Sequence, residues 1–455
     1  MLLNRVLLLA RVPLLAAAPL FMLLGQACKK YQPFTQTPMP EVTINAGDTR
    51  LSNNSIHLSK DTVYLLTTSI YRDSGQDLTI DPGTLIKVND NLSINIRPGA
   101  TIQAKGTAAA PIVFTSSAIT GTAGIGVSGN GVSGHYWNGL WIRGNAGSAT
   151  PQPSGTLNYV RIEFAGGYAN DILAALFLQN VVKGTSIEHV QVSYSSLNTS
   201  FEFAGGNCDA RYLISYASAS SDLYLHMGFT GRIQNVLAYR HPYFPDNQSS
   251  YYPGDALAGL LIRDNTSNPY ISNLTVVGPD SSTASTKYNA KGVRTGAFIA
   301  LGGANFHIRN SVFIGFPAAA WYLDDAAVAA AVDNGQADVT HSVFYTSDST
   351  KTFYLKPGTY GGTTSDQFKA FMLQSQFVNQ QFLSLNNFLL TDPFNYNAHP
   401  DPSPKTGSPL LSGANFDAPF NDDFFTKLDY LGALGTDSWM KDWSNFTPTQ
   451  SAYND

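Results

Sequence analysis

Two nine-residue stretches near the N-terminus decide the fold: Ile80-Asp-Pro-Gly-Thr-Leu-Ile-Lys-Val88 and Ile96-Arg-Pro-Gly-Ala-Thr-Ile-Gln-Ala104. In each, a short strand ends at a Pro-Gly turn and a second alternating strand follows. Proline fixes φ, and glycine supplies the positive φ that a tight type II corner needs. The copies are 16 residues apart, which is too short for a βαβ unit. We therefore expect them to stack as successive rungs.

A second repeat follows, in which an apolar residue, a variable residue and then Asn, His or Tyr precede a short apolar strand. Its copies end at Tyr159, His189, Tyr212, Asn235, Asn273, Asn310 and His341. A constant strand with loops of variable length between copies is typical of a solenoid whose insertions lie on one side. Coils stacked about 4.8 Å apart would pair their backbones and align inward aliphatic side chains. Asn235, Asn273 and Asn310 are the best candidates for an amide ladder at equivalent corners.

These repeats predict an all-β fold, a right-handed parallel β-helix over residues 46–350. Residues 351–455 are expected to form a short helical and loop-rich cap packed on the solenoid. Within the cap, Ser365 or Asp366 can begin a helix that covers the open C-terminal end of the stack. The aromatic residues Phe424, Phe425, Trp439 and Trp443 are expected to pack against the solenoid.

The composition agrees with an exported all-β protein. Of the 455 residues, 43% are hydrophobic and only 13% are charged, against a charged fraction of about 25% in ordinary soluble domains. The net charge of −5 provides no field that would attract nucleic acid. We therefore expect no nucleic-acid partner.

Residues 1–27 have the pattern of a signal peptide. Arg5 and Arg11 precede an apolar run over residues 12–24, and small residues lead to Ala27-Cys28. Two interpretations remain: ordinary signal-peptidase cleavage, or a lipobox in which Cys28 becomes the lipidated N-terminus, with Gly25 where leucine is usual. We favour lipidation, because it explains Cys28. The membrane would then be a partner through this lipid anchor, residues 28–45 would form a tether, and the protein would be an outer membrane lipoprotein at the cell surface.

Several segments resemble bacterial right-handed parallel β-helix surface lipoproteins with a pectin-lyase-like fold, a group without a settled function. They include Trp137-Asn-Gly-Leu-Trp-Ile142, Ser200-Phe-Glu-Phe-Ala-Gly-Gly206 and Asp429-Tyr-Leu-Gly-Ala-Leu-Gly435. The resemblance covers nearly all of the mature chain. It implies the fold but no particular activity.

The resemblance also bears on metal binding. Members of the group often carry an acidic run after the second of these segments, which would imply a cation site. Here residues 220–228 keep one carboxylate, Asp222, whereas Ca²⁺ takes six to eight oxygen ligands. We expect no metal or other cofactor, and Ca²⁺ is the alternative that the resemblance leaves open.

Two sets of residues are candidates for a functional site. Enzymes with this fold act on acidic polysaccharides, and a hydrolase needs paired carboxylates while a lyase needs a base. The candidate catalytic set is Glu202, Asp222, His226 and Asp264. The candidate binding set lies in the insertion 241–255, where aromatic rings could stack on sugars and polar groups could bond hydroxyls. It consists of Tyr243, Phe244, Tyr251, Tyr252 and Asp255.

Two functions follow from these sets. The favoured one is a non-catalytic surface lipoprotein that binds glycan or another macromolecule in adhesion. The alternative is a polysaccharide lyase or glycosidase acting on acidic polysaccharide, which rests on fold analogy.

Overall fold

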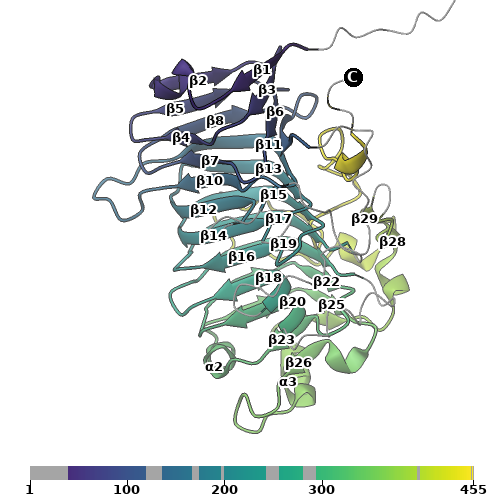
Figure 1. The fold of residues 1–455 in the computed structure, drawn as a ribbon. Helices are drawn as coiled ribbons and strands as arrows, with labels where there is room; N and C mark the ends of the chain where they lie inside the picture. The colour runs from purple at the N-terminus through teal and green to yellow at the C-terminus, as the bar shows by residue number, and fades with distance from the viewer. Residues whose placement is uncertain are drawn as a thin grey trace, which may run out of the picture. The chain divides into compact units, whose positions relative to one another are not determined.

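Short parallel strands separated by tight corners wind through the chain in two stacked sheets. The structure is a computed structural model, and it describes residues 39–118, 136–166, 174–195, 199–241, 256–279, 294–396, 400–451 and 453. Figure 1 shows the strands stacked in chain order from β1 towards β26. The predicted parallel β-helix is confirmed.

Each coil contributes strands to both sheets, and all strand pairs within the two sheets are parallel. The first sheet contains β1 (Glu41–Ile44), β2 (Ser55–Leu58), β3 (Val63–Leu66), β5 (Asp77–Ile80), β6 (Leu85–Val88), β8 (Thr101–Lys105), β9 (Ile112–Ser116), β11 (Gly155–Glu163), β13 (Ser186–Ser193), β15 (Asp209–Tyr216), β17 (Arg232–Tyr239), β19 (Tyr270–Val277), β21 (His307–Arg309), β22 (Val312–Ile314), β24 (Asp338–Thr340), β25 (Val343–Tyr345) and β27 (Gln380–Gln381). The second sheet contains β4 (Ile70–Arg72), β7 (Ser93–Ile96), β10 (Gly139–Arg143), β12 (Leu176–Val181), β14 (Phe201–Gly206), β16 (Leu223–His226), β18 (Ala256–Arg263), β20 (Arg294–Leu301), β23 (Trp321–Leu323) and β26 (Phe353–Leu355). Strands β26 and β27 extend the stack past residue 350, where the sequence places the end of the solenoid.

The Pro-Gly turns take the predicted positive φ but not the predicted stacking. Gly83 has φ +81° and Gly99 has φ +83°. However, the first turn joins β5 to β6 within the first sheet, whereas the second joins β7 of the second sheet to β8. Ile70 pairs with Ile94, 24 positions later, because each early coil contains three strand-and-turn units. Two turns that are 16 residues apart are therefore two corners apart within one coil. They do not stack on each other, so the prediction that they form successive rungs was wrong.

The second repeat marks a true corner. In each coil from β11 onward, one residue of the first sheet has the left-handed conformation. The chain bends at this residue, between two short portions of paired strand. The residues with this conformation are Tyr159, His189, Tyr212, Asn235, Asn273, Asn310 and His341, with φ between 49° and 59°. Asparagine and histidine tolerate this region better than most side chains, whereas tyrosine occupies it less often.

Inward side chains of successive coils form continuous apolar rows. In the second sheet, one row runs through Ile94, Leu140, Leu176, Phe201, Leu223, Leu260, Phe298, Trp321 and Phe353. Each of these side chains is fully buried, which contributes about 1.5–3 kcal/mol for a typical aliphatic or aromatic residue. The inward rows therefore hold the coils together.

Two α-helices are described, α2 (Ala326–Asp333) and α3 (Ser365–Met372). The sequence predicted that a helix begins at Ser365 or Asp366, and α3 begins at Ser365. Neither residue caps it, because the N-cap is Thr364, which forms a capping box with Gln367. The ring of Phe368 lies 5.2 Å from that of Trp321. Helix α3 thus covers the core at the end of the stack.

The C-terminal segment, residues 382–453, returns along the first sheet. It contains β28 (Leu390–Asp392) paired antiparallel with β29 (Asp401–Pro404), and short 3-10 turns at Leu385–Phe388, Pro409–Leu411 and Pro448–Gln450. Its partners on the solenoid have falling residue numbers: Asn415 bonds Asn310, Ala433 bonds Asn235, Asn445 bonds Gln191, and Tyr453 bonds Glu163. In Figure 1 its yellow end accordingly lies beside the early coils.

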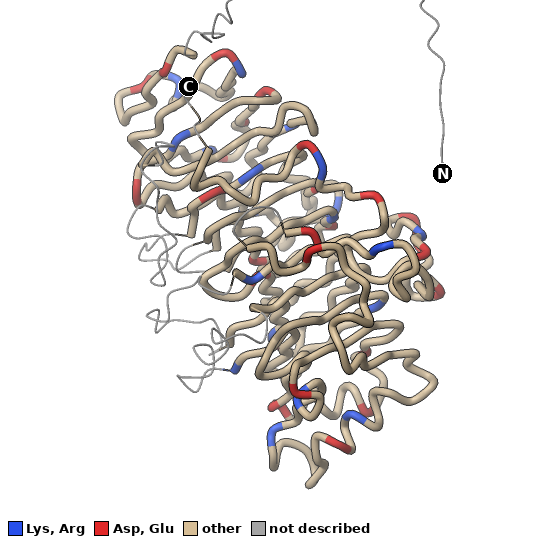
Figure 2. Tube along the Cα trace, turned by 90° about the vertical axis from the view of Figure 1, so that its right-hand side faces the viewer, with Lys and Arg blue, Asp and Glu red and all other residues tan. Residues whose placement is uncertain are grey.

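The C-terminal segment buries the outward apolar side chains of the first sheet. Leu237 and Tyr239 point outward and are fully buried in one cluster with Leu431, Met440 and Trp443. The view of this side in Figure 2 shows charged residues thinly scattered among uncharged ones. Strands β15, β17, β19, β22 and β25 thus carry apolar side chains on both faces, and the segment covers the outer one.

The predicted amide ladder takes a different form. The Nδ2 atoms of Asn235, Asn273 and Asn310 donate to backbone carbonyls of the C-terminal segment, at 2.9–3.1 Å. The three asparagines occupy equivalent corners as predicted, yet they bond this segment rather than one another. The reason is that the segment lies over the corner and presents backbone carbonyl groups there.

Candidate functional site

The second sheet carries a row of outward side chains, here called the outward column. Its members occupy paired positions in consecutive strands and are Tyr71, Asn95, Trp141, Phe177, Glu202, Tyr224, Leu261, Ile299, Tyr322 and Tyr354. Trp141 and Phe177 are less than a tenth exposed, whereas Tyr71 is 46% exposed. Sequence reasoning missed this column, although alternation with the buried aliphatic residues of each strand was a usable signal.

Glu202 and His226 meet on this face. Strand β14 places Glu202 opposite Tyr224 of β16, and Ala204 opposite His226. Because strand residues two apart share a face, Glu202 and His226 lie diagonally across adjacent strands, with His226 Nε2 2.9 Å from Glu202 Oε1. The other carboxylate oxygen accepts a hydrogen bond from the backbone N–H of Ala174 at 3.3 Å. The structure therefore brings two of the four predicted residues into direct contact.

Tyr224 completes this group from the same strand. Its ring stacks on the imidazole of His226, with centroids 4.0 Å apart. Burial raises the pKa of Tyr224, and the guanidinium of Arg263 beside it opposes that effect. Arg263 itself is exposed at the end of β18. We call Glu202, Tyr224, His226 and Arg263 the second-sheet site.

A basic and aromatic group lies on the two preceding strands of the same face, β10 and β12. The guanidinium of Arg143 lies 5.6 Å from the ring centroids of both Trp141 and Phe177, which is within the range of a cation–π contact. Arg143 also donates to Asn95 Oδ1 at 3.2 Å. Aromatic surface and charged hydrogen-bonding groups thus alternate along the column.

Asp222 lies in the core instead. It is fully buried and forms an ion pair with Arg240, also fully buried, at 2.8 Å. Its other oxygen accepts a hydrogen bond from Ser215 Oγ at 2.6 Å. Burial raises the pKa of this carboxyl, and the adjacent guanidinium opposes the shift. The residue precedes β16 at a corner, so its spacing from His226 does not place it on the outward face.

Asp264 holds a turn. One of its oxygens accepts hydrogen bonds from the backbone and hydroxyl of Thr266, at 3.2 and 2.7 Å, and from Ser267. The other accepts from the backbone N–H of Met227. Burial raises the pKa of Asp264, but these hydrogen bonds together bring it below its usual range. It therefore borders the second-sheet site with both oxygens occupied.

The described residues do not fit a Ca²⁺ site. Among them, no three His, Cys, Asp or Glu side chains gather as metal ligands would. Asp222, the carboxylate that the sequence pointed to, is neutralised by Arg240 in the core.

The predicted binding set lies outside the described residues. Tyr243, Phe244, Tyr251, Tyr252 and Asp255 all fall within 242–255, and Cys28 falls within 1–38, which are likewise outside them. In the chain order, 242–255 join β17 to β18, and 119–135, 167–173, 196–198 and 280–293 also join a first-sheet strand to the next strand of the second sheet. Helices α2 and α3 lie in connections of the opposite kind, from the second sheet to the first, so the described insertions are not confined to one side, contrary to what the repeat spacing predicted.

Among the described residues, no helix has the length and apolar character needed to cross a membrane. Comparison with curated proteins and comparison with solved structures gave no match. Residues 50–376 match the family model described as a pectate-lyase-like beta helix domain. That span is most of the chain and contains the strands from β2 to β26, so this protein belongs to the family of pectate-lyase-like β-helix domains.

Proposed function

We propose that this protein is an outer membrane lipoprotein, anchored through Cys28 at the cell surface, which binds glycan without chemical conversion. The second-sheet site and the insertion 242–255 would form the binding face. The proposal includes no metal, no other cofactor and no nucleic-acid partner.

The observation that carries the proposal is the pairing of Glu202 with His226 against the ring of Tyr224. The pair provides hydrogen-bonding groups, and the stacked ring of Tyr224 holds the imidazole in place. Sites for polar ligands commonly combine mostly apolar walls with a few fixed polar groups. The insertion 242–255 enters the sheet at β18, next to the strand that carries Tyr224 and His226.

Affinity electrophoresis of the mature protein against a panel of soluble polysaccharides tests the proposal. We expect at least one polysaccharide to retard the protein, and His226→Ala to weaken that interaction about tenfold or more. His57→Ala is the matched control, because His57 also bonds a carboxylate, Asp81, at 2.8 Å but lies exposed on the first sheet. No retardation by any polysaccharide would count against glycan binding.

Two further variants locate the binding face. Glu202→Leu removes the carboxylate but continues the apolar column, so the protein should fold and lose affinity. The double substitution Tyr251→Ala with Tyr252→Ala tests the insertion separately. Unchanged binding in all three variants would place the site elsewhere.

A polysaccharide lyase or glycosidase is the second candidate. The bond between Glu202 and His226 favours it, since such a pair can transfer protons. A lyase product absorbs in the ultraviolet and a hydrolase product is a new reducing end. If acidic polysaccharides yield either product and Glu202→Gln abolishes it, the enzyme replaces the binding protein as the conclusion.

The anchor is tested by labelling cells with a fatty acid. Label should enter the wild-type protein and be absent from Cys28→Ser. Equal label in both would remove Cys28 as the lipidation site.

A further inference from the structure

The C-terminal segment contacts a row of corner residues on the first sheet. This row, here called the corner row, consists of the left-handed residues Tyr159, His189, Tyr212, Asn235, Asn273, Asn310 and His341. The rings of Trp439 and Trp443 lie on its first three members, and backbone carbonyls of the segment accept hydrogen bonds from its asparagines. Histidine is the residue type in this row that changes its charge near neutral pH.

The surroundings of His189 disfavour a second proton on its ring. The imidazole is stacked between the rings of Tyr159 and Tyr212, whose centroids are 4.2 and 4.5 Å away. The rings of Trp443 and Trp439 approach it from the C-terminal segment, at 5.8 and 6.3 Å. Its Nδ1 atom is buried and has no hydrogen-bond partner among the described residues. Because a charged imidazole donates from both nitrogens, protonation would leave a buried N–H group without an acceptor, which costs free energy.

The charged side chains near His189 do not offset this cost. Glu188 of the same strand and Arg211 of β15 pair with each other at 2.9 Å. Burial lowers the pKa of His189 to about 4, while Glu188 raises it and Arg211 lowers it further. The C-terminal segment therefore packs against the neutral form of this ring.

His341 repeats the arrangement at the other end of the corner row. Its Nδ1 atom is also buried and has no hydrogen-bond partner in the part of the chain that the structure describes. Burial lowers the pKa of His341, the guanidinium of Arg309 adds to this effect, and Asp417 of the C-terminal segment opposes it. Arg309 donates to Asn415 Oδ1 and to the backbone carbonyl of Asp417. The segment is thus attached directly beside this second histidine.

Two other attachments of the segment do not weaken in mild acid. Burial raises the pKa of Asp422, but its bonds to Arg232 bring the pKa below its usual range, so this ion pair persists at about pH 5. Burial raises the pKa of Glu163, the partner of Tyr453. Its protonated form favours folding, so this attachment is not lost as pH falls.

We infer that the corner row is an acid-sensitive interface: protonation of His189 and His341 releases the parts of the C-terminal segment that cover them, residues 433–443 and 415–417, while residues 445–453 stay attached. Release of residues 433–443 uncovers outward apolar side chains of the first sheet, such as Leu237, which packs in one cluster with Met440 and Trp443. Acid would thus expose an apolar face on a solenoid that remains folded. The inference does not depend on glycan binding.

Amide hydrogen exchange of the mature protein at about pH 8 and about pH 5 tests the inference, with rates corrected for the intrinsic effect of pH on exchange. A pKa of about 4 in the attached state and about 6.5 in the released state would raise the opening equilibrium of residues 433–443 by up to about 30-fold. Protection of residues 445–453 should not fall. His189→Phe keeps a ring in the stack and should abolish the effect of pH over 433–443, while leaving that over 415–417.

His57→Phe is the matched control, because His57 lies on the first sheet with its side chain 60% exposed, and this variant should behave as the wild type does. Unchanged protection of residues 433–443 in the wild type between the two pH values would overturn the inference. So would a joint loss of protection over 433–443 and 445–453 in the wild type and in His189→Phe, because acid would then unfold the protein as a whole.

A second measurement needs no variant. Exchange of the Cε1 hydrogen of histidine, followed by mass spectrometry, gives the pKa of His189 in the wild-type protein. We expect a pKa well below that of an exposed histidine such as His57. Equal pKa values for the two residues would refute the acid-sensitive interface even if His189→Phe failed to fold.

Discussion

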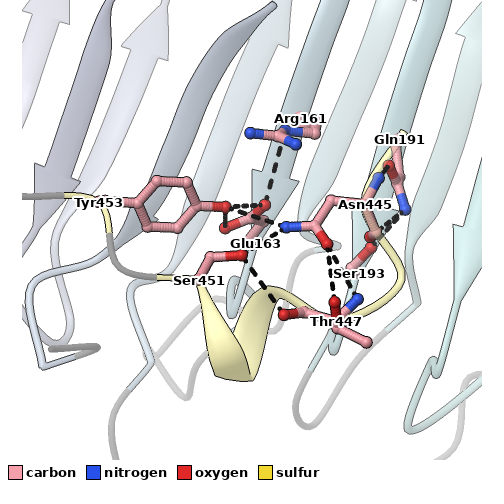
Figure 3. A network of polar contacts seen from close by, with 8 residues as sticks. All are labelled: Arg161, Glu163, Gln191, Ser193, Asn445, Thr447, Ser451 and Tyr453. Atoms are coloured by element: carbon pink, nitrogen blue, oxygen red, sulfur yellow. Dashed lines mark hydrogen bonds and ion pairs between the residues drawn. The ribbon is translucent and has the colours of Figure 1, made fainter. Parts of the chain in front are cut away.

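The last residues of the C-terminal segment form a hydrogen-bonded latch on the solenoid, and Tyr453→Phe should release it. The phenol of Tyr453 lies 2.6 and 2.7 Å from the two carboxylate oxygens of Glu163, which is 1% exposed. Nearby, the side-chain amide of Gln191 donates to the backbone carbonyl of Asn445 and accepts from its backbone N–H, each at 2.7 Å. Figure 3 shows these contacts, with Arg161 pointing towards the carboxylate.

The magnitude follows from the burial of Glu163. Phenylalanine retains the ring that packs against Val63, Leu85 and Val113, so the substitution removes hydrogen bonding and little packing. Leaving a buried acceptor without its donor costs about 1–3 kcal/mol. Because Tyr453 and Asn445 join the segment to the solenoid through hydrogen bonds, the cost should appear as local detachment of the segment. Amide exchange over residues 445–453 should accelerate about 5- to 150-fold, at about 1.4 kcal/mol per factor of ten.

The pH dependence of this defect has a definite sign. Burial raises the pKa of Glu163 above its usual value, and the phenol of Tyr453 opposes that shift. A raised carboxyl pKa means that the folded state favours the protonated form, so its stabilising effect is present at low pH and lost as pH rises. The exchange defect of Tyr453→Phe should therefore be larger at pH 7 than at pH 4.

Hydrogen exchange followed by mass spectrometry measures both effects. Tyr360→Phe is the matched control, because it also removes a phenol–carboxylate bond, to Asp333 at 2.9 Å, but at an exposed position. It should leave exchange in residues 445–453 unchanged. Equal exchange in Tyr453→Phe and the wild type would refute the latch.

Three other predictions concern the solenoid. Burial lowers the pKa of His189 to about 4, so the neutral ring favours folding, and stability should fall as pH drops from about 6.5 towards 4; the melting temperature of His189→Phe should depend less on pH in that window. Arg240→Met should cost about 3–5 kcal/mol in urea unfolding by leaving Asp222 charged in the core, and adding Asp222→Asn should restore part of it. Asn310→Ala should lower the free energy of unfolding by about 2 kcal/mol, because alanine makes neither hydrogen bond to Asn415 and adopts φ +54° less readily than asparagine. Asn310→Gly should recover only the part of this loss that comes from the backbone conformation.

The corners of the solenoid could be predicted from the sequence because their cause is local. A residue in the left-handed conformation is needed wherever the chain bends within the first sheet. Such a bend occurs in each coil from β11 onward, whatever the lengths of the loops. Asn273 therefore stands out in the sequence, as do the Tyr and His residues at the other corners. The two Pro-Gly turns were equally visible, but a turn does not reveal which of the three corners of a coil it occupies. Their stacking was therefore misjudged.

The candidate site was predictable only within continuous strands. Glu202 and His226 meet because each lies on a regular strand, where alternation fixes the face, and the strands are adjacent in the stack. Asp222 precedes its strand at a corner, so alternation does not apply, and its partner Arg240 comes from the following coil. The partners of the asparagine corners come from a segment more than 100 residues later, a distance over which no local pattern carries information.

The outward column gives a physical reason to place function at Glu202. Its neighbours in the register are Phe177 and Tyr224, so a leucine at this position would continue an apolar row. Glutamate instead places a carboxylate in a position that is 8% exposed. The imidazole of His226 and the backbone N–H of Ala174 bond it, but burying a charge costs free energy that such contacts often do not recover in full. A carboxylate in this row therefore costs folding free energy that a leucine would not, which supports the proposed binding role of Glu202. The same reasoning does not apply to Asp222, whose charge is matched by Arg240 and shielded on every side, and this difference is why the second-sheet site is built around Glu202 and His226.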